Sequence, residues 1–263
     1  MSIRTAPSPG VRLTLLRLAF AAAVIVLWQV VTASGAVPKD ALATPSSIAN
    51  VLVDIVPTGV FWSSVGATAL NWWLGVGIAF AIAVPLGFVL GAVPVLYELF
   101  TVPIEFMRTV PSVALLPVVL LLYGATGKMV VLLVALGAVW PLLLQSMYGI
   151  HQVDPLLEDV AAVYHLSVRE RVGFLLVPGA APFVATGLRI SVTIGLLLCV
   201  SAEILGGAPG LGREIALSQQ TLVVSEMYAY IVVVALMGTV VNLLMLKLER
   251  TTLSWHPSQR NAT

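Results

Sequence analysis

Polar side chains that interrupt long apolar stretches are the groups of this sequence best placed to do chemistry. Four are hydroxyls and one is a carboxylate: Ser112, Ser191, Thr193, Ser201 and Glu203. Inside a membrane such groups either line the route of a polar solute or hydrogen-bond a neighbouring helix. Glu203 has a further, structural alternative, because it precedes the glycine-rich stretch 206–212 and can accept hydrogen bonds from its backbone N–H groups. The five residues are candidates for a translocation pathway.

The sequence lacks the patterns of an enzyme or of a metal site. Residues 124–129, GATGKM, lack the leading glycine and the hydroxyl residue after Lys128 that a phosphate-binding loop requires. The single cysteine, Cys199, excludes an intrachain disulfide, and the three histidines have no metal-ligand spacing. We therefore expect no catalytic residue, no metal and no cofactor in this chain.

Composition indicates a membrane protein. Of 263 residues, 59% are hydrophobic and 10% are charged, against about 25% charged in soluble domains. The mean hydropathy is +1.04, and several apolar runs approach the 20 residues that a spanning helix needs. A net charge of +1 argues against a nucleic-acid partner. These features predict an all-α, polytopic protein embedded in lipid.

Six apolar runs are candidate spans, and together they form one transmembrane domain over residues 13–263, after a tail over residues 1–12. The runs cover about residues 13–32, 64–90, 111–123, 129–148, 182–205 and 227–246. Arginines precede the first run and small residues follow it, so it also fits a cleaved signal peptide, which would leave five spans. We expect a retained signal-anchor helix.

The distribution of basic residues predicts the orientation. With the N-terminus inside, the inner segments hold most of them: Arg4, Arg12, Arg17, Arg108, Arg169, Arg171, Lys247, Arg250 and Arg260. The outer segments hold Lys39, Lys128 and Arg213, and Arg189 lies at the inner membrane edge. Positive charge favours the cytoplasmic side, so both termini and the segment after the fourth span are predicted to be cytoplasmic.

That cytoplasmic segment carries the signals of two short helices. Asp154 is a good N-cap and Pro155 a good first residue for a helix that runs to about His165. Ser167 then begins a second helix, and Glu170 completes a capping box with it. These signals alone do not distinguish the stretch from any other amphipathic cytoplasmic loop.

Residues 154–189 resemble the EAA loop of bacterial binding-protein-dependent ABC importer permeases, whose pattern is E-A-A-x-x-x-G, then Leu-Pro, a second Pro and G-x-R. Aligned on 177–178 and 187–189, the family Glu falls on Asp159, its alanines on Val160 and Ala161, and its Gly on His165. The resemblance implies a coupling loop, about residues 149–178, that docks on an ATPase. Its residues are Glu158, Asp159, Ala161, Ala162, His165, Leu166, Ser167 and Arg169.

Two further stretches resemble the same family. Pro103, Arg108, Pro111, Ala114 and Pro117 match its P-x-x-x-x-R-x-x-P-x-x-A-x-x-P order, and residues 202–212 match A-E-x-x-G-x-x-x-G-L-G. The resemblance covers about residues 38–255 and is closest to permeases for nitrate, sulfonates and taurine. It implies a bacterial inner-membrane importer with an ATPase dimer that binds ATP and Mg²⁺, a second permease (the same chain or a paralogue) and an external solute-binding protein.

Several alternatives stay open. If the chain is not an importer permease, it is either a secondary carrier or a membrane interaction subunit that carries no solute. Asp159 and His165 depart from the family pattern, and they indicate either a specialised ATPase surface, a heterodimer with a more typical permease, or plain drift in a homodimer. The solute is not specified by the sequence.

Three local contacts are also predicted. We expect Ser46 or Ser47 to cap an external helix that runs through Asp54, and Arg108 to pair with Glu105 one helical turn away. Gly87 and Gly91 form a small-xxx-small pair that lets two helix backbones approach closely.

Overall fold

The computed structural model of the chain describes residues 9–38 and 41–252, and this part is helical apart from short connections, with no strand. The all-α prediction is confirmed. By length and composition, five of the described helices can cross a membrane, or six if one bent pair counts as a single span. The predictions for residues 1–8 of the N-terminal tail and for the end beyond residue 252 lie outside the described residues.

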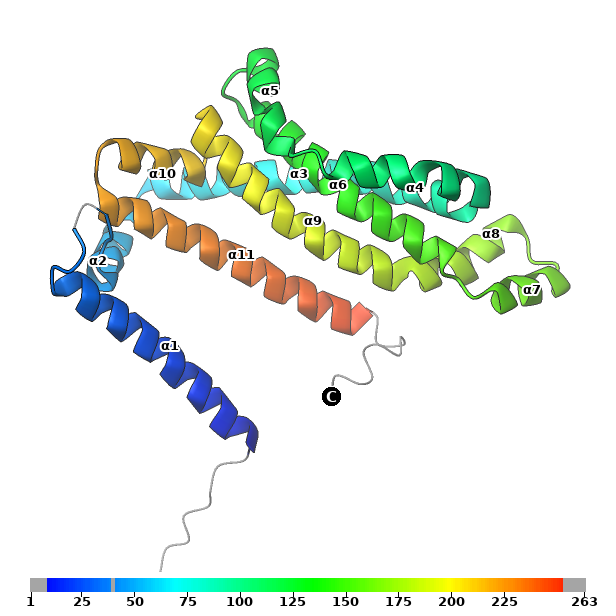
Figure 1. Cartoon of the computed structure of the whole chain (residues 1–263), viewed down its shortest axis with the longest axis horizontal. Coiled ribbons are helices and arrows are strands. Elements are labelled where there is room, and N and C mark those ends of the chain that lie inside the picture. The colour runs from blue at the N-terminus through cyan, green and yellow to red at the C-terminus, as the bar shows by residue number, and fades with distance from the viewer. Residues whose placement is uncertain (1–8, 39–40, 253–263) are drawn as a thin grey trace, which may run out of the picture.

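Three long helices form the centre of the bundle. They are α3 (Gly59–Ala92), α6 (Gly127–His151) and α9 (Val177–Gly206), which run side by side in Figure 1. Their shared core is apolar and includes the fully buried Trp72, Met129 and Leu142. The predicted close approach is confirmed, because a Cβ on Gly87 would lie 2.6 Å from the Cβ of Ser146, and one on Gly91 would lie 2.5 Å from the carbonyl oxygen of Met147. Small residues thus set the spacing between α3 and α6.

The chain between α3 and α6 contains a bent pair of helices, which is either a broken span or a re-entrant loop. A 15-residue helix, α4 (Pro94–Arg108), lies along α6, and it is followed by η1 (Ser112–Leu115) and α5 (Leu116–Tyr123). The two halves meet at an angle of 73°. Pro111 stands at the break, where it lacks a backbone donor and holds Val110 out of the helical region. Figure 1 shows α5 leaving the line of the bundle.

The remaining helices cover the two ends of the bundle. At one end lie α2 (Pro45–Ile55) and α10 (Leu211–Gln220), with α11 (Val224–Thr252) packed along α9 (Figure 1). The cap prediction for α2 was wrong in its residue: Thr44 is the N-cap, and its hydroxyl accepts from the backbone N–H of Ser47 at 3.1 Å. Helix α1 (Pro9–Ala33) stands away from the bundle, and Gln29 near its end holds the backbone N–H and hydroxyl of Ser46.

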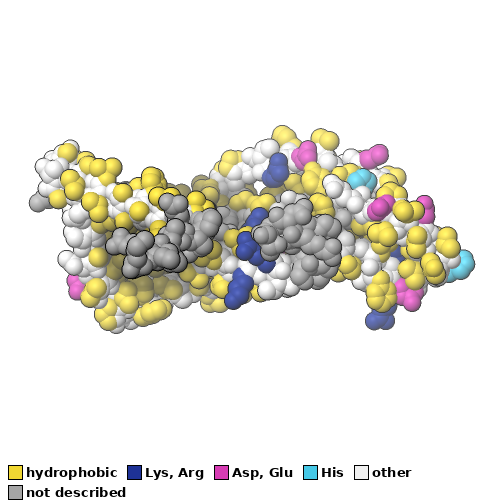
Figure 2. Space-filling model, turned by 90° about the horizontal axis from the view of Figure 1, so that it is seen from below, with side chains coloured by type: hydrophobic (Ala, Val, Ile, Leu, Met, Phe, Trp, Pro, Cys, Tyr) yellow, Lys and Arg dark blue, Asp and Glu magenta, His cyan; other side chains and the backbone are white. Residues whose placement is uncertain are grey.

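The opposite end carries α7 (Pro155–Val163) and α8 (Val168–Arg171), joined to α9 by a π-helical turn, η2 (Val172–Leu176). Figure 2 shows most of the visible acidic and histidine side chains towards this end, Lys and Arg side chains nearer the middle, and hydrophobic side chains over much of the remaining visible surface. The apolar surface matches a lipid environment, and the charged end matches water.

Candidate functional site

The α7–α8 corner is built as the sequence predicted. Asp154 caps α7, accepting a hydrogen bond from the backbone N–H of Leu156 at 2.9 Å. The capping box is also present: the backbone N–H of Ser167 donates to Glu170 at 2.9 Å, and that of Glu170 donates to the Ser167 hydroxyl at 3.4 Å. Helix α7 ends at Val163, two residues before the predicted end. These local bonds define where the two short helices begin.

A left-handed residue makes the turn between them. His165 has a φ of +51°, so the position where the family pattern has glycine does require the conformation that glycine favours. The backbone N–H of His165 donates to the carbonyl of Ala162 at 3.1 Å, and that of Leu166 to the carbonyl of Ala161 at 3.0 Å. This is a Schellman motif, which ends a helix by satisfying its last carbonyls. Histidine is among the side chains that tolerate this region.

An ion pair ties the two helices together. Arg171 on α8 donates to Glu158 on α7 at 2.5 Å. Asp159, at the position of the family Glu, is exposed and makes no hydrogen bond or ion pair within the described residues. Of the predicted loop residues, Ala161 is buried beneath the corner and Glu158 is half-buried, while Ala162, His165, Leu166, Ser167 and Arg169 are exposed.

Large apolar side chains also face outward here. Val163, Tyr164, Val168 and Phe174 are each at least 75% exposed, beside charged neighbours. An exposed apolar patch with a polar rim marks a protein contact more often than a free surface. The arrangement provides a rigid, two-helix knob with an apolar tip, suited to docking on another protein.

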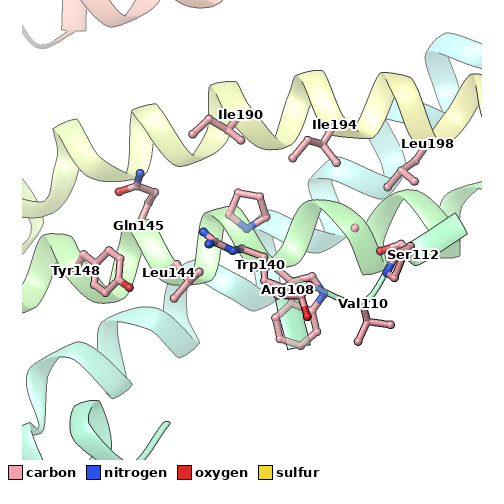
Figure 3. Close-up of a pocket in the computed structure, with 14 residues that line it drawn as sticks. Arg108, Val110, Ser112, Trp140, Leu144, Gln145, Tyr148, Ile190, Ile194 and Leu198 are labelled. Atoms are coloured by element: carbon pink, nitrogen blue, oxygen red, sulfur yellow. The ribbon is translucent and has the colours of Figure 1, made fainter. Parts of the chain in front are cut away.

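A second feature is a cavity of about 520 Å³ at the break between α4 and η1. Its walls come from this break and from facing stretches of α6 and α9, and Figure 3 shows their side chains. Arg108 is the one charged side chain among the lining residues, and Gln145 and Ser112 add an amide and a hydroxyl. Trp140 and several aliphatic residues complete the wall. A cavity of this size is large enough for a small solute.

The predicted Arg108–Glu105 pair is not formed. Glu105 instead accepts a hydrogen bond from the hydroxyl of Tyr148 on α6 at 2.7 Å. Arg108 makes no ion pair or hydrogen bond within the part of the chain that the structure describes. Its guanidinium extends from the end of α4 towards the side of α6 that carries Leu144 and Gln145 (Figure 3).

The structure does not bring the five predicted pathway residues together. Ser112 lines the cavity, whereas Ser191 is fully buried and donates to the carbonyl of Ala138 at 2.7 Å, a contact between α9 and α6. Thr193 and Ser201 line a different cavity of about 690 Å³ between α9 and α11. That separation follows from helix geometry, because position 191 points to a different side of α9 from positions 193 and 201.

Glu203 lies in a closed polar cluster away from both cavities. Its carboxylate accepts hydrogen bonds from the backbone N–H of Gly212 and from the hydroxyl of Thr68, each at 2.9 Å. The Thr68 hydroxyl in turn accepts from the backbone N–H of Leu211 at 2.8 Å. Glu203 and Thr68 are fully buried. The contact with Gly212 is the one that the structural alternative for Glu203 predicted, and it fastens α10 to α3 and α9.

Sequence reasoning missed three residues of the cavity. Arg108 was assigned to an ion pair, and Gln145 and Trp140 were not singled out. Gln145 carried a usable signal, since it is the one amide in the apolar run of the fourth span. What the sequence could not supply was the bend that turns residues 108–112 to face α6.

Comparisons with known proteins agree with this architecture. A family model described as a binding-protein-dependent transport system inner membrane component matches residues 83–253. A Bacillus subtilis (strain 168) permease, SsuC, named as a candidate transporter of aliphatic sulfonates, is 30% identical over 90% of this chain and 86% of its own. The taurine transport system permease TauC of Escherichia coli (strain K12) is 25% identical over 89% and 87%.

Two further similarities complete the comparison. The nitrate import permease NrtB of a Synechocystis strain is 27% identical over 64% of this chain and 62% of its own. The methionine ABC transporter MetNI, solved in inward facing conformations, includes a chain with the same fold, with a TM-score of 0.63 and 16% identity over 73% of this chain and 95% of that one. The chain therefore belongs to the family of binding-protein-dependent inner-membrane transport components and is a permease subunit of an ABC importer.

Proposed function

We propose that this permease imports a small anionic solute, and that the α7–α8 corner is the surface on which a cytoplasmic ATPase docks. The observation that carries the proposal is the corner itself: two short helices, fixed by caps, an ion pair and a Schellman motif, that present an apolar tip at one end of the bundle. A rigid pair of helices transmits a movement of the partner protein to the helix bundle, whereas a flexible loop would deform instead.

The route of transmission is short. Helix α8 continues through η2 into α9, and α9 contributes to the wall of the cavity. A push on the corner is therefore delivered directly to a helix that lines the proposed pathway. π-helical turns within a helix often mark functional positions where geometry changes. We infer that η2 is the joint at which movement of the corner is converted into rotation or bending of α9.

The solute class is inferred from the relatives. Sulfonates, taurine and nitrate, for which the similar permeases are named, all carry an anionic oxygen group. We propose the same class for this chain. In the complete assembly, two permease subunits, an ATPase dimer that binds ATP and Mg²⁺, and an external solute-binding protein would work together, with the corner and both termini on the cytoplasmic side.

The first test is co-purification of the tagged chain in mild detergent, with mass spectrometry of its partners. We expect an ATPase together with either this permease alone or a second permease, which separates a homodimer from a heterodimer. A Val168→Asp variant places a charge on the exposed tip and should lose the ATPase. Val53→Asp, at a similarly exposed position on α2 at the other end, is the matched control and should retain it. A folded wild-type sample without any ATPase would overturn the proposal.

A further inference from the structure

The cavity at the break of α4 has the properties of an anion site. Its lining contains one positive charge, on Arg108, and no acidic side chain. Arg108 is exposed, has no ion-pair partner within the described residues, and the carboxylate nearest in sequence, Glu105, accepts a hydrogen bond from Tyr148. The guanidinium is therefore available to an anion that enters the cavity.

The walls beside Arg108 carry no competing charge. Trp140, Leu144, Ile190 and Ile194 are apolar or aromatic, and the exposed Arg108 is the one charged residue of the lining. A cleft lined by charge of one sign concentrates ions of the opposite sign. The planar fork of donors on the guanidinium also matches the oxygens of a sulfonate, nitrate or carboxylate group.

Four neutral polar side chains also line the cavity, and two of them, Gln145 and Ser112, extend the site along it. Gln145 lies towards the guanidinium end, and Ser112 lies at the other end, where it faces Gly137 (Figure 3). A Cβ on Gly137 would lie 3.2 Å from the Ser112 hydroxyl and closer still to Cδ1 of Leu198, so the glycine lets both side chains approach α6 closely. An anion that leaves Arg108 can therefore contact a second polar group, the Ser112 hydroxyl, further along the same cavity.

We infer that Arg108, with Gln145 beside it, binds the anionic group of the solute inside the permease, so that this chain selects anions in addition to the external binding protein. The inference rests on the proposed function, because it supposes that the cavity is part of the solute's route. The ligand class is a small monovalent anion, with oxyanions favoured by the guanidinium fork.

Trp140 supplies a direct readout, because it lines the same cavity. Iodide, a small anion, quenches tryptophan fluorescence by contact, and acrylamide does so without charge. The contribution of Trp140 is the difference between the purified wild-type complex and its Trp140→Phe variant. Methanesulfonate does not quench and should displace iodide when it is titrated at constant ionic strength.

In Arg108→Gln we expect iodide quenching of Trp140 to fall about tenfold, with loss of the methanesulfonate effect and unchanged acrylamide quenching. Arg108→Lys keeps the charge and should retain most of the quenching. Lys128→Gln, which removes one charge at the far end of α6, is the matched control and should behave as wild type.

Equal iodide quenching in Arg108→Gln and wild type would overturn the inference, and so would an equal loss in Lys128→Gln, which would reveal an effect of net charge alone. Dissociation of the permease pair in Arg108→Gln without any change in quenching would assign Arg108 to a subunit contact instead. If Arg108→Gln also altered acrylamide quenching, its structure would have changed and its iodide result would not report on charge. The Arg108→Lys variant would then decide: retained iodide quenching supports the inference, and lost quenching contradicts it. The assay needs no ATPase, so its failure is distinguishable from failure of co-purification.

Discussion

At the scale of single residues, Glu203 shows how a polar group can serve packing in a transporter. Its carboxylate satisfies the backbone N–H of Gly212 and the hydroxyl of Thr68, which in turn holds the N–H of Leu211. Without the carboxylate, the buried N–H of Gly212 and the buried hydroxyl of Thr68 lose their acceptor. The cluster has no opening to either cavity, so its effect on transport would pass through the position of α10.

We therefore expect Glu203→Ala to lower stability by about 1–3 kcal/mol, the cost of leaving buried donors unsatisfied. Thermal unfolding of the purified chain in detergent measures the effect. Glu226→Ala, near the start of α11 at the same end of the bundle, is the control and should have an unfolding temperature close to wild type. If both variants unfolded at the wild-type temperature, the assigned structural role of Glu203 would be wrong.

His165 links the residue scale to the coupling corner. Its φ of +51° is tolerated by histidine and glycine but strained for a β-branched side chain by about 1–2 kcal/mol. His165→Val should weaken the corner and lower stimulation of ATP hydrolysis by the loaded binding protein, whereas His165→Gly should preserve it. If His165→Gly abolished stimulation while the corner remained folded, the imidazole itself would contact the ATPase, which favours a specialised docking surface.

At the scale of elements, glycines set the distance between α3 and α6. A side chain at Gly87 would collide with Ser146 and with the backbone of α6, whereas Gly66 on the same helix has open space around it. Gly87→Leu should destabilise the bundle by roughly 1–3 kcal/mol through overpacking, and Gly66→Leu should be nearly neutral. Detergent unfolding curves of the two variants would measure this. Equal effects would show that α3 and α6 do not pack as described.

The two short helices were predictable from the sequence, whereas the cavity was not. Capping residues act within a few positions, so Asp154, Ser167 and Glu170 revealed both coupling helices with near-correct ends. The αL turn at His165 lies where the family pattern has glycine, so it was indicated by the resemblance and not by the capping residues. The cavity could not be predicted in that way, because it depends on the bend after Arg108 and on which side of α6 carries Gln145. The scatter of Ser191, Thr193 and Ser201 likewise depends on helix packing.

At the scale of the whole molecule, α1 is the outlying element. Its apolar span is almost wholly exposed within one chain, yet its last turns are fastened to α2 through Gln29 and Ser46 and through Trp28, which packs beside Ile48. A signal peptide would be removed with these contacts. We expect α1 to be retained, and the intact mass of the purified chain should equal that of residues 1–263. A mass lower by that of α1 and the residues before it would show that this segment had been cleaved off.

The two ends of the bundle have different partners in this account. We propose that the α7–α8 end meets the ATPase and that the end with α2 and α10 faces the binding protein. Cys199 is the chain's single cysteine and is fully buried, so one engineered surface cysteine would be the accessible thiol. This allows each end to be probed without altering the native residues of the cavity.

The most direct test of the coupling claim is thiol crosslinking of the assembled complex from one end at a time. Leu166→Cys reports from the exposed corner and Gln220→Cys from the end of α10. We predict that Leu166→Cys forms an adduct with the ATPase subunit and that Gln220→Cys does not. An ATPase adduct from Gln220→Cys, or none from Leu166→Cys in a complex that still contains the ATPase, would contradict the account.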